Sequence, residues 1–142
     1  MLVGNSLSPE EVMAVPKDFV DGAIKSVNWK AGKFDMLPIV FGIVMALIDI
    51  SMMGTLKLVD QGKVAYALGF PIATLLYAFE PYVFLKAMTH SNMVVTNLIW
   101  NLASNILVTL AGVLFFNESI KGLKWLAIGM SLFSLAIFAY SE

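Results

Sequence analysis

Four long apolar runs dominate the chain, and short polar links separate them. The apolar runs cover residues 36–58, 64–86, 92–116 and 123–140. Each run is long enough to cross a hydrocarbon core of ~30 Å, which takes about 20 helical residues. An open chain crosses lipid as helices, because lipid cannot hydrogen-bond a free N–H or C=O group. The pattern therefore predicts an all-α membrane protein, with a four-transmembrane-helix bundle over residues 36–142.

The polar links and the prolines indicate how these helices are arranged. The links, at residues 59–63, 89–91 and 117–121, are short, so consecutive helices should be antiparallel neighbours. Pro38 falls in a first helical turn, where proline is tolerated. Pro71 and Pro81 lie inside the second run and predict kinks there.

Residues 1–35 follow a mixed pattern and form a separate N-terminal segment. Ser8, Pro9 and Glu11 predict a helix start, with a serine cap, an early proline and a glutamate in the first turn. Farther on, apolar residues recur at helical spacing among charged ones: Phe19, Val20, Ile24 and Val27. This spacing predicts an amphipathic helix on the membrane surface, with Trp29 as an interfacial anchor. A partly ordered tail is the alternative, because two glycines weaken any helix here.

The composition supports a membrane protein and narrows the classes of function. The chain is 59% hydrophobic and 13% charged, whereas soluble domains carry about a quarter charged residues. Its formal net charge of −1 and its lack of arginine argue against nucleic acid as a partner. The sequence holds no cysteine, phosphate-binding loop, metal-spaced cluster or nucleophile triad. We therefore expect no enzyme activity, no catalytic residues, no cofactor and no metal.

Asp49 lies in the middle of the first apolar run. Helix rise puts it ~12 Å from Lys57 and ~20 Å from Met36, which is close to the centre of the membrane. An ionised side chain costs about 2.5–3.5 kcal/mol there, so Asp49 should face protein or water. Such a group can hold a proton or a cation, which makes it the first candidate for a functional site. The alternative is a protonated aspartate that hydrogen-bonds a neighbouring helix.

The third run carries a polar stripe at helical spacing, formed by Asn97, Asn101 and Ser104, with Trp100 on its flank. Polar stripes in membrane helices line cavities or join helices, and this run alone fits both. Asp49 favours the cavity, because a carboxylate, amides and an indole ring together suit an organic cation.

Two further features are candidates of lower weight. In the fourth run, Gly129 and Ala136 belong to a row of small residues that suits a dimer interface or packing within the bundle. Glu80, just before Pro81, is a possible secondary acid of the site, although the favoured interpretation is that it lies near the membrane interface or pairs with a lysine such as Lys86 at the membrane edge.

Several matches in order and spacing resemble a known family over residues 37–140. Asp49 is followed by Lys57 at the end of its helix, and Trp100 by Phe115-Phe116 and then Asn117-Glu118. Gly129 and Ala136 follow on the fourth helix. The pattern resembles the drug/metabolite transporter superfamily, in particular the small multidrug resistance family of four-helix exporters and the EamA-like half-transporters. The small multidrug resistance family has glutamate at the position of Asp49 and tyrosine at the position of Asn97.

The resemblance implies a transporter that works as a homodimer and exchanges protons for a small cationic or amphipathic metabolite or drug. Asp49 would bind substrate and proton in turn, Trp100 would stack on the cation, and Asn97, Asn101 and Ser104 would line the path. Lys57 is a possible secondary residue, and Gly129 and Ala136 would form the dimer face. The alternative is a non-transporting four-helix subunit of a larger membrane assembly. We expect a plasma or inner membrane, with an organelle or viral membrane as the alternatives.

Overall fold

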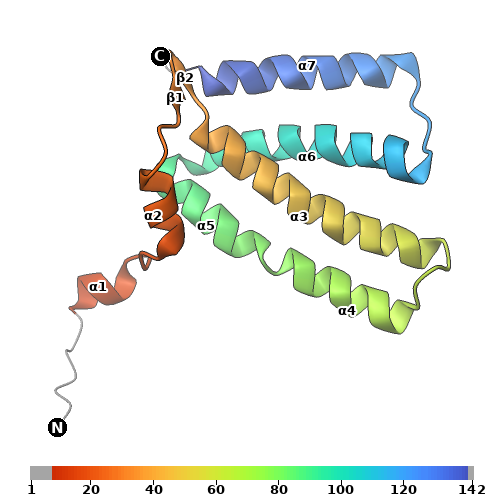
Figure 1. Ribbon diagram of the computed structural model, residues 1–142, viewed down its shortest axis with the longest axis horizontal. Coiled ribbons are helices and arrows are strands. Elements are labelled where there is room, and N and C mark those ends of the chain that lie inside the picture. The colour runs from red at the N-terminus through yellow and green to blue at the C-terminus, as the bar shows by residue number, and fades with distance from the viewer. Residues whose placement is uncertain (1–7, 141–142) are drawn as a thin grey trace, which may run out of the picture.

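The computed structural model describes residues 8–140, and within this range it contains four helical spans (Figure 1). The first, third and fourth are single helices: α3 (Leu37–Asp60), α6 (Met93–Phe116) and α7 (Gly122–Ala139). The second span, Tyr66–His90, consists of α4 (Tyr66–Tyr77) and α5 (Glu80–His90). All four are long and apolar enough to cross a membrane. The predicted all-α four-helix architecture is therefore confirmed, although the second span runs farther along the chain than the predicted 64–86.

The second span is broken between Tyr77 and Glu80, and Pro81 explains the position of the break. A proline lacks the backbone N–H and clashes with the carbonyl group four residues earlier, which here belongs to Tyr77. The helix therefore ends one turn before Pro81, and Pro81 occupies the first turn of α5 instead. Pro71, in contrast, lies inside α4 without ending it.

Helix α3 lies at the centre of the bundle, with α6 on one side and α4 and α5 on the other (Figure 1). Its contact with α6 is close at Gly42, where a Cβ atom would lie only 2.7 Å from the Cγ2 atom of Ile99. A small core forms where Phe41 and Met45 of α3 meet Ala87 of α5. The large side chains of α7 are mostly exposed, and it packs mainly against α6.

The N-terminal segment contains two short helices, α1 (Pro9–Met13) and α2 (Phe19–Lys25). The capping box predicted at Ser8 and Glu11 is present, with hydrogen bonds in both directions. The amphipathic pattern forms α2, which ends at Lys25, before the last apolar residue of the pattern. Of its apolar residues, Ile24 packs against the small core, whereas Phe19 is largely exposed.

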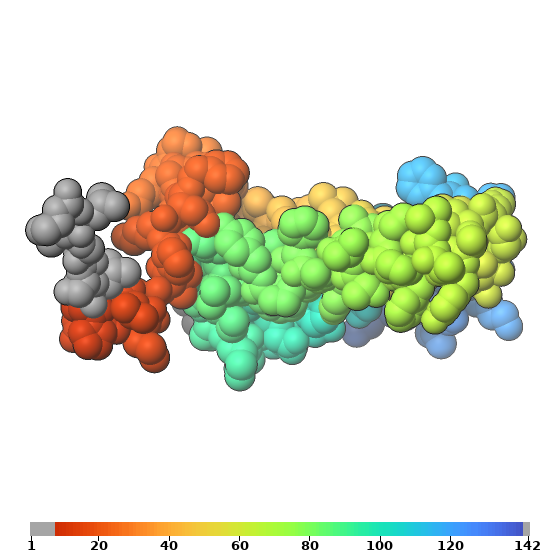
Figure 2. All heavy atoms as spheres, turned by 90° about the horizontal axis from the view of Figure 1, so that it is seen from below, coloured from red at the N-terminus to blue at the C-terminus, as the bar shows by residue number. Residues whose placement is uncertain are grey.

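A two-stranded hairpin that the sequence did not predict connects α2 to α3. Strands β1 (Lys30–Ala31) and β2 (Phe34–Asp35) pair antiparallel, and Gly32 supplies a positive φ of 64° in the turn. Phe34 also pairs with Tyr140 just after α7, and their rings meet edge to face at 5.7 Å. Residues 8–35 thus gather at one end of an elongated bundle, as Figure 2 shows.

Candidate functional site

Asp49 of α3 is 4% exposed, and its carboxylate is held by two side chains of α6. The indole Nε1 of Trp100 donates a hydrogen bond to Oδ2 at 2.8 Å, and the Ser104 hydroxyl donates to the same oxygen at 2.7 Å. The two donors are one helical turn apart and therefore share a face of α6. Three of the predicted site residues thus form one hydrogen-bonded cluster.

The close approach of α3 and α6 explains why Asp49 meets these donors. Gly42 and Asp49 lie two turns apart on the same face of α3, and Gly42 lets this face approach Ile99 and Ala103 of α6. Both α6 residues are buried at the contact. A larger residue at position 42 would push the helices apart and lengthen the hydrogen bonds at Asp49.

The structure does not bring the two predicted amide residues into this cluster. Asn97 and Asn101 are exposed on a neighbouring strip of α6. The side-chain amide of Asn101 donates to the backbone oxygen of Asn97 at 2.9 Å and to its side-chain oxygen at 3.1 Å. These amides therefore bond to each other on the outside of the single chain.

Glu80, the possible secondary acid, is 2% exposed at the start of α5. Neither of its carboxyl oxygens has a hydrogen-bond partner among residues 8–140. An ion pair between Glu80 and Lys86, one of the two favoured interpretations, is wrong in this structure, because Lys86 points to the N-terminal segment instead.

Lys86 is 2% exposed and binds three groups of that segment. Its ammonium group donates to the backbone oxygen of Pro16 and to Asp21, each at 2.8 Å, and lies 3.5 Å from Asp18. Tyr82 also donates a hydrogen bond to Asp18. The hydrogen bond from Lys86 lowers the pKa of Asp21, and the one from Tyr82 lowers the pKa of Asp18. This cluster fastens α2 to α5, a contact that the sequence did not predict.

Lys57 lies at the far end of α3, ~12 Å from Asp49 by helix rise. Its ammonium group is 3.2 Å from Glu118 and 3.7 Å from Asp60. The sequence did not predict the ion pair with Glu118. Asn117 adopts a left-handed conformation with φ of 53°, and this turns the chain back so that Glu118 lies against Gly112. The ion pair joins the end of α3 to the link between α6 and α7.

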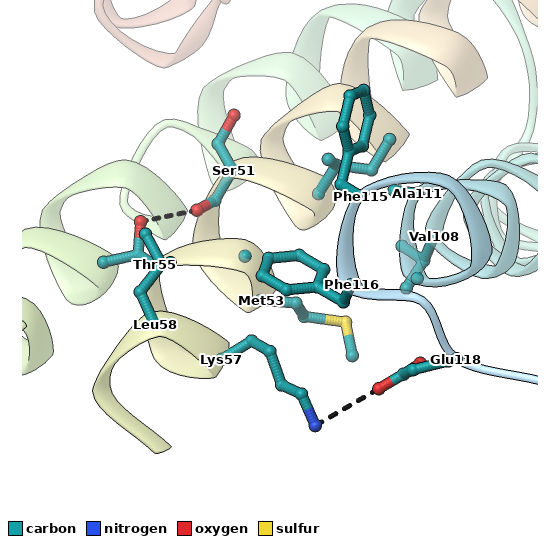
Figure 3. Close-up of a pocket in the computed structure, with 13 residues that line it drawn as sticks. Ser51, Met53, Thr55, Lys57, Leu58, Val108, Ala111, Phe115, Phe116 and Glu118 are labelled. Carbon is teal, nitrogen blue, oxygen red and sulfur yellow. Dashed lines mark hydrogen bonds and ion pairs between the residues drawn. The ribbon is translucent and has the colours of Figure 1, made fainter. Parts of the chain in front are cut away.

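A cavity of about 340 Å³ opens between α3 and α6 beside this ion pair (Figure 3). Figure 3 shows Phe116 between the two helices, with Lys57 and Glu118 meeting at the edge. The lining of the cavity is largely apolar. The Thr55 hydroxyl donates its hydrogen bond to the backbone oxygen of Ser51 in its own helix. The lining residues do not include Asp49 or Trp100, so in the described part of the chain this cavity and the carboxylate cluster are separate.

Gly129 and Ala136 both lie exposed on α7, and a Cβ atom at Gly129 would meet no atom within 4 Å. Ala136 borders a shallow apolar groove shared with α3 and α6. The residues are therefore accessible to a second molecule.

The fold and these polar clusters define a multi-pass membrane protein. Comparison of the chain with protein-family models, with curated proteins and with solved structures gives no match. Within residues 8–140, no group of three or more His, Asp or Glu side chains is placed to hold a metal ion. The function must therefore be argued from the site itself.

Proposed function

We propose that the chain is one subunit of a homodimeric membrane transporter that exchanges protons for a small cationic or amphipathic metabolite or drug. The observation that supports this most is the carboxylate of Asp49, buried at the middle of a membrane span and bound by the donors of Trp100 and Ser104. An intramembrane acid that is held in place by its neighbours is typical of proton and ion pathways.

The chemistry of exchange follows from the free-energy cost of an uncompensated carboxylate near the middle of the membrane. Two neutral donors stabilise the carboxylate but do not cancel its charge, so a proton or a cation still binds favourably. The two compete for the same oxygens, which links the release of one to the binding of the other. The indole face of Trp100 adds attraction for an organic cation.

The outer strip of α6 supports a dimer. Asn97 and Asn101 are exposed there, and an amide that faces lipid is costly unless protein or water covers it. A second copy of the chain would cover this strip and enclose polar space next to Ser104. The exposed face of α7 at Gly129 is free to form the interface.

The proposed cycle requires a second conformation. Asp49 is enclosed between α3 and α6 in the conformation described, so a substrate reaches it only after these helices separate at this depth. Binding energy then shifts the population between a closed and an open state.

The test is proton-driven flux in liposomes that contain the purified protein and carry a pH gradient. A panel of small organic cations is screened with the wild type, with Asp49→Asn and with Asp60→Asn as a control at the exposed end of the same helix. We expect Asp49→Asn to abolish the flux that Asp60→Asn preserves. Equal behaviour of the wild type and Asp49→Asn for every cation would show that transport through Asp49 is wrong.

The second candidate is a structural subunit of a larger membrane assembly. It is favoured by the enclosure of Asp49, whose hydrogen bonds join α3 to α6 of the same chain. Under this alternative the wild type carries no cation, and Asp49→Asn lowers only the stability of the bundle.

A further inference from the structure

Glu80 lies at the same depth in the bundle as Asp49. Two contacts fix the antiparallel register of α3 against the second span: Val59 packs on Gly69, and Phe41 stacks on His90 with ring centres 6.0 Å apart. Helix rise places Asp49 ~12 Å from Phe41, and places Glu80 ~15 Å from His90, measured from the same end of the bundle. The two acids therefore differ in depth by ~3 Å, about two residues of helix.

Glu80 also faces the Asp49 cluster. Phe84, one turn along α5, shares its face and meets the ring of Trp100 edge to face at 4.9 Å. Because α5 and α6 are antiparallel, the turn of α5 from Phe84 back to Glu80 runs alongside the turn of α6 from Trp100 to Ser104. Glu80 is thus level with Ser104, which donates to Asp49. The register and the shared face therefore place the two carboxyl groups beside the same turn of α6.

Within the described part of the chain, the surroundings of the two acids hold no balancing cation. Helix α6 has no titratable side chain, and the titratable side chains of α4 are the phenols of Tyr66 and Tyr77. Lys86 is bound to Asp21, and Lys57 is bound to Glu118. Among residues 8–140, no lysine pairs with Asp49 or Glu80. The site therefore contains two acids whose full ionisation leaves two uncompensated negative charges.

The carboxyl oxygens of Glu80 are buried and have no partner within the described residues, which points to a ligand. Two adjacent carboxylates in a medium of low dielectric do not both ionise without a counterion. Electroneutrality is reached with two protons, with one proton and a monocation, with two monocations, or with one dication.

We propose that Glu80 is the second proton- and cation-binding group of the Asp49 site, and that the site prefers organic dications and exchanges each of them for two protons. This inference rests on the proposed transport function and adds the class of substrate. When a dication binds, both carboxylic acids release their protons, so the charge of the occupied site is unchanged. A monocation displaces only one proton, and Glu80 keeps the other.

The first test compares two permanently charged cations of similar length, hexamethonium with two quaternary ammonium groups and hexyltrimethylammonium with one. Binding to the full-length protein in micelles is measured by calorimetry in buffers of different ionisation enthalpy, which reports the protons released. We expect two protons released per hexamethonium by the wild type and one by Glu80→Gln. The affinity of Glu80→Gln for hexamethonium should fall by about tenfold or more, as for the loss of one close charge pair, and its affinity for hexyltrimethylammonium should fall by less.

Two further variants separate a loss of binding from a loss of folding. Glu80→Asp keeps a carboxyl group and should restore the release of two protons, whereas a purely structural role of Glu80 would not depend on the acid. Asp60→Asn is the matched control and should behave as the wild type does.

Flux measurements then separate the two levels of the argument. In one outcome, wild-type flux depends on Asp49, while Glu80→Gln keeps the dication preference and the proton release of the wild type. This result would overturn the role of Glu80 and leave the transport function intact. Binding of hexamethonium with release of two protons, but without flux in the wild type, would support the two-acid site and overturn transport.

Discussion

The hydrogen bond from Trp100 to Asp49 leads to a quantitative prediction. Trp100→Phe removes the indole N–H, which lies 2.8 Å from Asp49 Oδ2, and keeps an aromatic ring against Phe84. A hydrogen bond to a charged acceptor contributes about 1.5–3 kcal/mol in soluble proteins. Hydrogen bonds between membrane helices contribute about 0.6 kcal/mol on average and about 1.7 at most. Ser104 still donates to the same oxygen after the substitution, so the carboxylate does not lose every partner.

We therefore expect a coupling free energy between Trp100 and Asp49 of about 1–1.5 kcal/mol, near the upper end of the membrane range. The assay is a double-mutant cycle of Trp100→Phe and Asp49→Ala, with the free energy of unfolding measured in mixed micelles by denaturant titration. Trp125→Phe, at a partly exposed position on α7, is the control and should change stability by less than about 0.5 kcal/mol.

The interpretation would be refuted if Trp100→Phe destabilised the Asp49→Ala protein as much as it destabilises the wild type. The indole would then contribute through its size alone, and the carboxylate would not be held by it.

Two further substitutions test how the helices and the N-terminal segment are held. Gly42→Ala places a methyl group 2.7 Å from Ile99 Cγ2 in a buried contact, so we expect the free energy of unfolding to fall by about 1–3 kcal/mol. Gly129→Ala, which has open space around it, should be neutral or stabilising by up to about 1 kcal/mol. Equal effects of the two would contradict the close approach of α3 and α6. Lys86→Met should lower the hydrogen-exchange protection of residues 19–25, because α2 loses its ionic attachment to α5. The pKa of Asp21 is lowered in the folded protein, so this attachment contributes stability above the ordinary carboxyl value of 3.8 and loses it as pH falls below that value. Protection of α2 that is unchanged from pH 6 to pH 3 would contradict this reasoning.

Local spacing was enough to predict the four spans of this fold, but not the β1–β2 hairpin. The four apolar runs, the capping box at Ser8 and the interruption at Pro81 each depend on residues within a few positions of one another. The depth of Asp49 follows in the same way, since helix rise converts sequence separation directly into distance. Each of these features is fixed before any two helices meet.

The partners of the polar side chains were decided only by the tertiary structure. Ser104 and Asn101 belong to one polar stripe in sequence, yet Ser104 reaches Asp49 and Asn101 stays outside, because the rotation of α6 against α3 separates them. Lys86 lies closer in sequence to Glu80 than to Asp21, yet it binds Asp21, because the N-terminal segment folds back over α5.

The same distinction applies to the candidate site. Residue spacing alone predicted that an acid lies near mid-membrane and that an indole and polar groups are available on another helix. Spacing did not predict that Glu80 is buried without a partner among residues 8–140. Lys86 was an available partner in sequence, but in the fold it binds Asp21 of the N-terminal segment. Ion pairs depend on which surfaces meet, and that is a property of packing between distant segments.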